Sequence, residues 1–551
     1  MLATATLQSS SLSTAAFCLG VALHVLVFRI GEWDLATTKL LKVFATANVV
    51  LVFLLKAILL PYPDNTIWTA LKITSWLATN LAAGIEISML VYRVLFHRLG
   101  RFPGPFAARL SNFYGTVLSA KNLHLYEEVE KLHNTYGDFV RLGPSELSIN
   151  NPKAVHAISS SQSPCTKGPF YTVLDPRKSM HMIRDPAEHA HRRKVWDHAF
   201  SAKSLRDYEP RVARYTDQLL AHLEETKGQP INVSDWFNFY SFDVMGDLAF
   251  GKSFNMLQNG VKHYFMTSLH ADMTNVGVLG RLPWLFPIFK ATPVVNYEHK
   301  RFWEWVDKQV DDRKKTTPEK PDVFEWLLKD YNAQEKPTFN DEMYLAGDAY
   351  LVAVAGSDTT AASLITLFFQ LALDRRVRKT LQDEIDKYFE TVETVDSMSL
   401  SKLPYLDAVI TETMRLHPPV PSGVQRMTPP DGLLIDNTWI PGNTVVQVPY
   451  HTLFRDERLF LQPQDFIPER WTSRPELIKD SSPFVPFSTG RYGCIGKQLG
   501  LMELRYVVSQ IIRRYDAEFA PGQTAEGFLE GKRDAFTLSL GALELVLKPR
   551  K

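Results

Sequence analysis

Three apolar stretches within the first hundred residues constrain the fold of this chain more than any other feature. They cover Ala15–Ile30, Val43–Leu60 and Trp76–Phe96. A helix needs about 20 apolar residues to cross a bilayer, so the third stretch is long enough and the first two are marginal. Backbone in lipid must satisfy its hydrogen bonds internally, which predicts helices here. We expect residues 1–100 to form a membrane anchor with up to three transmembrane helices.

Basic residues beside these stretches predict their orientation. They gather at the first connection and after the third stretch: Arg29, Lys39, Lys42, Arg93, Arg98 and Arg101. Because such residues favour the cytosolic side, the remainder of the chain is expected in the cytosol, attached to a membrane such as the endoplasmic reticulum. Two alternatives are a cleaved signal peptide, although no basic segment precedes Ala15, and buried helices of a soluble domain.

The remaining residues, 101–551, read as one large domain. The Pro103–Pro105 segment predicts a stiff connector before it, because proline fixes φ and lacks a backbone donor. The chain has 61 basic and 60 acidic side chains, which argues against a nucleic-acid partner. Its three cysteines, Cys18, Cys165 and Cys494, do not describe a disulfide-stabilised secreted protein, so a reducing compartment is expected.

A glycine-rich loop presents Cys494 directly before a helical pattern. The segment is Pro486–Lys497, with glycines at 490, 493 and 496. Backbone N–H groups and the dipole at a helix N-terminus favour a thiolate, and glycines let backbone approach a flat ligand closely. For an isolated cysteine, a buried position in a tight turn is the commoner explanation.

This loop resembles the heme-binding signature of the cytochrome P450 family. Four residues occupy the family positions: Phe487, Gly490, Cys494 and Gly496. The resemblance implies heme b as cofactor, with Cys494 as the thiolate ligand of its iron. The family usually has Arg or His two residues before the cysteine, in contact with a heme propionate. Tyr492 stands there in this chain, so the propionate contact at this loop stays open, although its hydroxyl can donate one hydrogen bond.

An acid and an alcohol interrupt the long apolar stretch Tyr344–Leu373. The sequence there is Ala355-Gly356-Ser357-Asp358-Thr359-Thr360. Small residues beside an acid–alcohol pair can form a local gap with proton-handling groups. A helix end capped by Ser, Asp or Thr is the structural alternative. The segment resembles the central helix of the family, which implies that Asp358 relays protons and that Thr359 holds the water network at the bound oxygen.

Glu412 and Arg415 lie three residues apart, on one helical face. Most such pairs lie on a surface, but here the flanking residues are apolar. A buried pair needs further partners, and Arg470 is a candidate. The three residues resemble the Glu–Arg–Arg cluster of the family, which implies a role in folding and heme retention.

A basic segment around His189 and Arg193 has two interpretations. These two side chains lie four residues apart on one helical face and could hold a carboxylate, or the segment could be a solvated basic face. In the family, a helix at this place contributes to the heme propionates, and Arg426 fits another such position. The resemblance implies that these residues supply the positive charge that Tyr492 does not.

The resemblance, which runs from about Phe102 to the C-terminus, implies a monooxygenase with an apolar small-molecule substrate. The electrons would come from a membrane-bound NADPH–cytochrome P450 reductase, or from a cytochrome b-type donor. The electron donor would dock on a basic face of four residues: Arg192, Lys194, Arg491 and Lys497. Candidate pocket walls are Phe170–Met182, the central helix near Val354 and Ala355, Val420–Val424 and Phe536–Leu538, although Phe170, Tyr171 and Met182 could equally be ordinary core. The sequence of Pro486–Leu499 is most similar to that of ascomycete enzymes of secondary metabolism.

Two other functions remain as alternatives. One is a heme-thiolate isomerase or dehydratase, which works without a reductase and tends to lack the acid–alcohol pair. The other is a non-catalytic heme-binding protein. The expected fold is mainly α-helical with small β-sheets, behind the N-terminal transmembrane helices. Periodicity predicts helices over Glu342–Leu373, Arg375–Phe389 and Lys497–Arg514, and strands near Phe139–Leu142, Ser145–Ile149 and Thr444–Val448.

Overall fold

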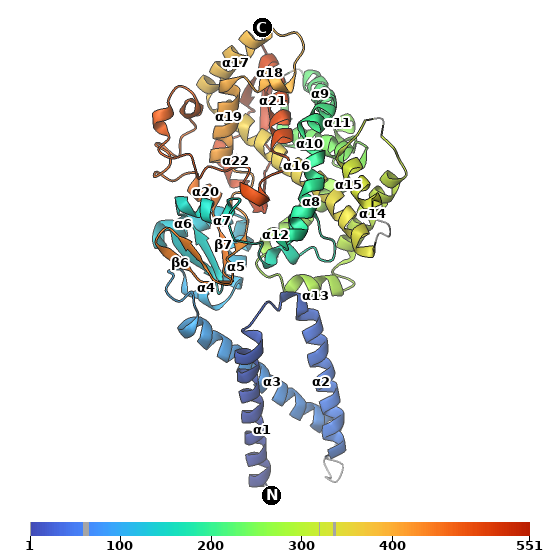
Figure 1. The fold of residues 1–551 in the computed structure, drawn as a ribbon, viewed down its shortest axis with the longest axis vertical. Coiled ribbons are helices and arrows are strands. Elements are labelled where there is room, and N and C mark those ends of the chain that lie inside the picture. The colour runs from blue at the N-terminus through green and yellow to red at the C-terminus, as the bar shows by residue number, and fades with distance from the viewer. Residues whose placement is uncertain (1, 59–65, 227, 319, 334–337, 551) are drawn as a thin grey trace. The chain divides into compact units, whose positions relative to one another are not determined.

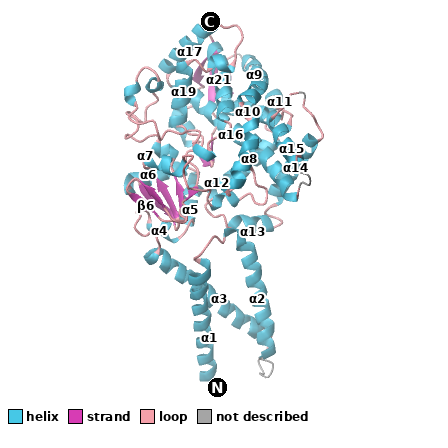
Figure 2. Ribbon diagram, in the orientation of Figure 1, coloured by secondary structure: helices cyan, strands magenta, loops and turns pink. Residues whose placement is uncertain are grey.

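The computed structural model describes residues 2–58, 66–226, 228–318, 320–333 and 338–550. Helices form most of the described chain and strands form small sheets (Figures 1 and 2). The expected mainly helical fold with small sheets is confirmed.

The α-helices preceding the central helix are α1 (Leu2–Leu23), α2 (Thr37–Ile58), α3 (Ile67–Val91), α4 (Phe106–Leu110), α5 (Phe113–Asn122), α6 (Leu125–Tyr136), α7 (Pro152–Ser159), α8 (Pro186–Ala199), α9 (Ala202–Glu225), α10 (Val233–Phe250), α11 (Met256–Asn259), α12 (Tyr264–Leu279), α13 (Leu285–Ala291), α14 (Tyr297–Lys314) and α15 (Val323–Asn332). The central helix and those after it are α16 (Phe339–Leu373), α17 (Arg375–Phe389), α18 (Ser397–Leu400), α19 (Pro404–Leu416), α20 (Tyr450–Leu453), α21 (Lys497–Arg514) and α22 (Ala525–Glu530). Short 3-10 segments include η4 (Pro169–Thr172), η5 (Met180–Met182), η6 (Pro468–Trp471) and η8 (Gly490–Tyr492).

The strands form four small sheets. Their bounds are β1 (Phe139–Gly143), β2 (Glu146–Ile149), β3 (Pro230–Asn232), β4 (Arg426–Met427), β5 (Leu433–Ile435), β6 (Thr438–Ile440), β7 (Val445–Gln447), β8 (Tyr515–Phe519), β9 (Arg533–Ala535), β10 (Thr537–Ser539) and β11 (Glu544–Pro549). The strand orders are β1-β2-β7-β4, β3-β11-β8, β5-β6 and β9-β10. In β4–β7, Arg426 pairs with Val446 in an antiparallel register. The three strands predicted from the sequence coincide with β1, β2 and β7.

Three N-terminal helical segments are long and apolar enough to cross a membrane. They are Ser10–Phe28, Asp34–Ile58 and Ile67–Phe96, and they overlap the three predicted stretches, of which Val43–Leu60 ends outside the described residues. Helices α1 and α3 pack closely, since a Cβ at Gly20 or Gly84 would clash with the opposite backbone. Small residues allow this approach between membrane helices. The Trp76 indole also donates to the Ser13 hydroxyl across the pair, at 2.8 Å.

The compact unit that contains these helices also includes later parts of the chain. It comprises Met1–Tyr114, Arg141–Glu146 and Arg281–Tyr297, and within it α13 contacts α2. The predicted connector belongs to this unit as well, where Arg141 N–H donates to the Pro103 carbonyl at 2.8 Å. The division of the chain at residue 100 therefore stays a prediction, and the compact units divide differently.

Helix α16 forms the centre of the second unit. A capping box at its start, in which Thr338 and Asp341 bond each other's backbone, fixes where the helix begins. The helix contacts α10, α15, α19 and α21 and is buried over most of its length. Its apolar composition would also suit a membrane span, but 78% of that window is buried in protein. A helix that is hydrophobic all round and enclosed by others is a core helix.

Candidate functional site

The Cys494 loop is a tight turn that leaves the side chain of Cys494 accessible, although protein atoms surround it. Gly490 has φ +67°, and a Cβ there would clash with the Ser159 carbonyl. Only glycine adopts both the conformation and the approach at low cost. Cys494 N–H donates to the Phe487 carbonyl at 2.8 Å, which closes the loop. The side chain of Cys494 is exposed.

Opposing influences act on the Cys494 thiol. The protein packed around it raises its pKa, whereas the backbone N–H groups of Gly496 and Lys497 and the charges of Arg193 and Lys497 lower it. Gly496 is the N-cap of α21, so the N-terminus of this helix lowers the pKa of the thiol, as predicted. Burial has the larger effect, and the net pKa is raised. A bound metal ion deprotonates a coordinating thiol outright. The loop therefore offers a thiol that a metal ion would convert to a thiolate.

The burial of helix α16 is interrupted at one place, which leaves an opening on one side of the helix. Between Leu345 and Leu371, all of which the structure describes, Ala355 is the one exposed residue, and Gly356 and Thr359 beside it are half-buried. The Thr359 hydroxyl donates to the Ala355 carbonyl at 2.6 Å, which keeps it on this side. Helices α16 and α21 are in contact near Thr360 and Gly500. The opening and the Cys494 loop are thus brought to the same region.

Asp358 is buried in α16 and contacts a histidine. It is 8% exposed, and its Oδ1 lies 3.1 Å from Nε2 of His270 on α12. The Thr537 hydroxyl approaches the other carboxylate oxygen at 3.5 Å. The His270 side chain is 36% exposed. The carboxylate is therefore connected to the outside through one imidazole, which sequence analysis missed because His270 lies 88 residues earlier with no motif around it.

Cations surround the ring of Tyr492. Nζ of Lys167 lies 4.8 Å from the ring centroid and Cζ of Arg426 lies 4.7 Å from it. The His189 ring meets the same ring edge-on, with centroids 4.7 Å apart. Arg426 also donates to the Tyr171 hydroxyl at 3.0 Å. These five residues are called the Tyr492 cluster below.

The Tyr492 cluster has donors without acceptors. Among the described residues, neither Lys167 nor Arg426 forms an ion pair, and the Tyr492 hydroxyl and Nε of Arg426 are buried without a hydrogen-bond partner. Burial, followed by the charges of Lys167, Arg193 and Arg426, lowers the pKa of His189 to about 3. Buried donors normally have partners. Heme carries two carboxylates, and this surplus of donors and positive charge fits such a group.

The other residues predicted to bind the cofactor are placed differently. Arg193 donates to the Gly493 carbonyl at 2.8 Å and to Asp197 at 2.9 Å, so its guanidinium braces the Cys494 loop. Phe487 packs against the core of the unit. Lys167 was not predicted, because nothing in the local sequence distinguishes it from an ordinary surface lysine.

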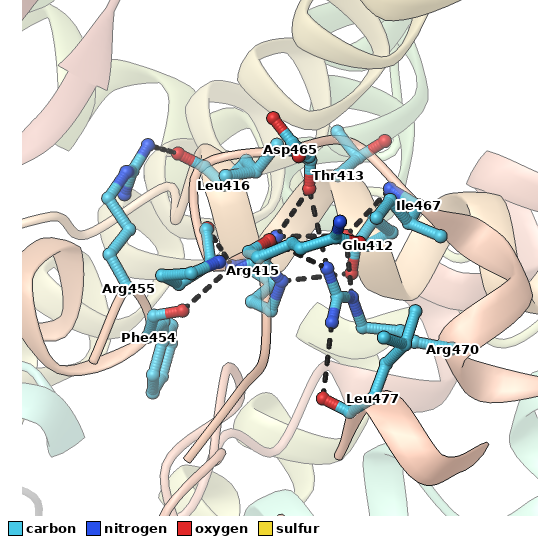
Figure 3. A network of polar contacts seen from close by, with 12 residues as sticks. Glu412, Thr413, Arg415, Leu416, Phe454, Arg455, Asp465, Ile467, Arg470 and Leu477 are labelled. Carbon is cyan, nitrogen blue, oxygen red and sulfur yellow. Dashed lines mark hydrogen bonds and ion pairs between the residues drawn. The ribbon is translucent and has the colours of Figure 1, made fainter. Parts of the chain in front are cut away.

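Glu412 lies at the centre of a buried, fully paired cluster (Figure 3). Its carboxylate accepts from Arg415 at 2.8 and 2.9 Å and from Arg470 at 2.9 Å, and all three side chains are completely buried. It also accepts from the Trp471 indole and the Ile467 N–H. The two guanidinium groups donate further hydrogen bonds to backbone carbonyls of the following segment, 454–477. The structure thus assembles what we call the Glu412 cluster: Glu412, Arg415, Arg470 and Trp471.

Among Val354, Ala355, Val420 and Val424, all but Val354 lie at positions that are at least partly open. Ala355 is exposed, Val420 and Val424 are half-buried, and Val354 is buried. The rings of Phe170 and Phe536 stack with centroids 5.4 Å apart. Phe536 has φ +77°, which is strained for a bulky residue and fixes the turn between β9 and β10.

The predicted basic face is only partly available. Lys194, Arg491 and Lys497 are exposed. Arg192 instead pairs with the buried Asp348, which also accepts from Met180 N–H. Its charge is therefore used within the fold.

Comparison with known proteins agrees with these residues. Residues 104–544 match the cytochrome P450 family. The chain is 52% identical to the cytochrome P450 monooxygenase FCK2 of Fusarium pseudograminearum over 97% of each chain. It is 49% identical to the cytochrome P450 monooxygenase orf5 of Eupenicillium brefeldianum over 84% of this chain and 94% of that protein. It is 35% identical to tryprostatin B 6-hydroxylase of Aspergillus fumigatus over 97% of this chain and 95% of that protein.

Proposed function

Because this chain belongs to the cytochrome P450 family and is a heme-dependent monooxygenase, we propose that Cys494 is the thiolate ligand of its heme iron. We propose further that the enzyme inserts one oxygen atom into an apolar small molecule of secondary metabolism. One observation carries this assignment: the exposed Cys494 thiol, held at the N-terminus of α21, lies in the region where α16 is opened at Ala355.

Bound heme supplies oxygen activation, which a thiolate ligand favours by donating electron density. The chain's own part is to hold that group and exclude competing ligands. The thiol of Cys494 would hold the iron, and the donors of the Tyr492 cluster would bind the carboxylates. Ala355, the exposed small residue of α16, would leave room for a flat ring against this helix, whereas the missing side chain of Gly356 is filled by Met245 of α10.

The acid–alcohol pair handles protons in this proposal. Asp358 accepts a proton from His270, 3.1 Å away, and the partly exposed imidazole takes another from solvent. Rotation of the carboxyl brings that proton to the side of Thr359. The Thr359 hydroxyl, which donates to Ala355 in the protein alone, orients the water that receives it. Positioned acid–base groups of this kind accelerate proton-dependent steps about 100- to 10,000-fold.

Electrons come from a separate flavoprotein, an NADPH–cytochrome P450 reductase in the same membrane. Lys194, Arg491 and Lys497 form the exposed part of the basic face near the Cys494 loop. A basic face attracts an acidic partner mainly through its rate of association. The N-terminal helices are long and apolar enough to anchor the chain, and the basic residues beside them favour a cytosolic catalytic domain, at the endoplasmic reticulum.

The substrate is bound by apolar side chains between α16 and the β9–β10 turn. Phe170 and Phe536 present stacked rings there, and Val424 and Ala355 are partly open. A relative of this chain carries the name of a hydroxylase, which supports hydroxylation as the outcome. The acid–alcohol pair disfavours an isomerase or dehydratase, because those reactions need no delivered protons. A non-catalytic heme-binding protein would need neither this pair nor an exposed basic face.

The test is the carbon-monoxide difference spectrum of the reduced, full-length protein in membranes. We expect a strongly red-shifted Soret band that is lost in Cys494→Ser, because an alcohol does not replace the thiolate. Cys18→Ser, in an exposed position of α1, is the matched control and should keep the band. A wild-type spectrum without that band, or a band that survives in Cys494→Ser, would refute the assignment.

A further inference from the structure

Lys167 is a buried cation without an anion. It is 2% exposed, and its ammonium group donates to the carbonyls of Met180 at 3.2 Å and His181 at 2.7 Å. An ammonium group has three donors, so two neutral carbonyls leave one without an assigned acceptor. No carboxylate pairs with it among the residues that the structure describes. Burial of a charge without its counter-charge is costly, so an anion from outside the described chain would stabilise the charged form of Lys167.

The backbone holds Lys167 beside a second buried cation. Thr166 and Met427 exchange two backbone hydrogen bonds, at 3.0 and 2.8 Å, which places Lys167 next to Arg426 across this bridge. Arg426 is 3% exposed, and its charge further lowers the pKa of Lys167, which burial already lowers well below its ordinary value. Like charges that face each other across strands repel. This bridge therefore forces together two cations that a bound anion would stabilise.

Tyr492 shows where that anion would lie. Lys167 and Arg426 lie 4.8 and 4.7 Å from its ring centroid, and its hydroxyl is buried without a partner. Tyr492 is two residues before Cys494, the position at which the family usually places a cation. In this chain the neighbourhood of that position is positive although the residue itself is neutral. The charge comes from Lys167, in the segment between α7 and η4, and from Arg426 on β4.

We propose that Lys167, which lies over the ring of Tyr492, supplies the cation that the Cys494 loop lacks. Together with Arg426 and the Tyr492 hydroxyl, it binds a carboxylate of the heme. This inference rests on the proposed heme site. It replaces the expectation that His189 and Arg193 provide this charge, because Arg193 is engaged with Gly493 and Asp197 and His189 is buried among cations. Lys167 binds the cofactor by charge and takes no part in electron or proton transfer.

The experiment measures heme loss from the full-length protein in detergent, with excess apomyoglobin as the acceptor. Lys167→Met should release heme about tenfold faster or more, because one charged hydrogen bond is lost. Lys167→Arg should stay within about threefold of the wild type, since it keeps the charge. Lys153→Met removes an exposed lysine that pairs with Asp436, and it should leave the rate unchanged. Each rate is read from the Soret band and needs no substrate.

A second variant separates binding from packing. In the Lys167→Met background, Tyr492→Arg should restore most of the heme retention, because it returns a cation to the family's usual position. A structural role for Lys167 would not be rescued this way. Failure of both Lys167→Arg and Tyr492→Arg to restore retention would overturn the proposal. So would an unchanged rate in Lys167→Met with weaker binding of a carboxylate-bearing substrate, such as a fatty acid, which would assign the site to substrate. Wild-type protein without heme would instead refute the proposed function itself.

Discussion

The Glu412 cluster and the Tyr492 cluster are both buried groups of charged and polar side chains, and they differ in one respect. In the Glu412 cluster, one carboxylate lies between two guanidinium groups and every oxygen has donors. In the Tyr492 cluster, two cations flank a tyrosine and no carboxylate is bonded to them in the described chain. We expect that removing one partner from the complete cluster destabilises the fold, and we infer that the cluster without an anion binds one from outside the chain.

The largest effect is expected from Glu412→Gln. The amide keeps the shape of the side chain but leaves Arg415 and Arg470 buried without a counter-charge. Breaking such a buried pair costs about 3–5 kcal/mol, so the free energy of unfolding should fall by that amount. Chemical denaturation of the purified protein measures it. Glu476→Gln is the control: it changes an exposed glutamate near Arg474 and should shift stability by no more than about 0.5 kcal/mol. Equal stability of the two variants would contradict the comparison.

A matched pair of arginine substitutions tests the comparison directly. Arg470→Met should destabilise the protein by about 3 kcal/mol with or without heme, since it leaves Glu412 short of a partner. Arg426→Met in heme-depleted protein should change stability by no more than about 1 kcal/mol, because the lost bond to Tyr171 is offset by relief of the repulsion from Lys167. With heme bound, Arg426→Met should speed heme loss at least about tenfold. If both variants destabilised the heme-depleted protein equally, the two clusters would not differ in kind.

A smaller effect is expected at the opening of α16. Thr359→Ala should keep heme but lower the product formed per oxygen consumed by at least about tenfold, because the hydroxyl that orients water is gone. Thr360→Ala is the matched control, since its hydroxyl faces α21 rather than the opening. Oxygen uptake and product yield, measured together, give the ratio. Equal coupling in the two variants would show that Thr359 has no part in proton delivery.

Local signals predicted the long elements of this fold well. The strands β1, β2 and β7 and the helices α16, α17 and α21 occur at or within a few residues of the predicted ranges. Apolar periodicity defines α17, the long apolar stretch defines α16, and caps such as Thr338 and Asp374 fix the first turns of these two helices. The family resemblance, carried by the Cys494 loop and the acid–alcohol pair, is confirmed by the match over residues 104–544.

Contacts between distant segments could not be predicted. Lys167 contacts Tyr492 and His270 contacts Asp358, and in each pair the two residues lie far apart along the chain. No spacing rule connects them. Arg192 was expected on the exposed basic face but pairs inward with Asp348. The charge of a side chain is evident from sequence, whereas its partner depends on how the helices pack. These roles therefore become visible only in three dimensions.

The contact between α13 and α2 bears on how the enzyme can be purified. A shortened chain that begins near residue 100, intended to avoid detergent, would keep α13 (Leu285–Ala291) and lose the helix that it packs against within the same compact unit. The apolar side chains of α13 would then be uncovered, and uncovered apolar surface promotes self-association. Truncation alone would leave an exposed apolar surface on α13, and solubility would also require polar substitutions on this helix.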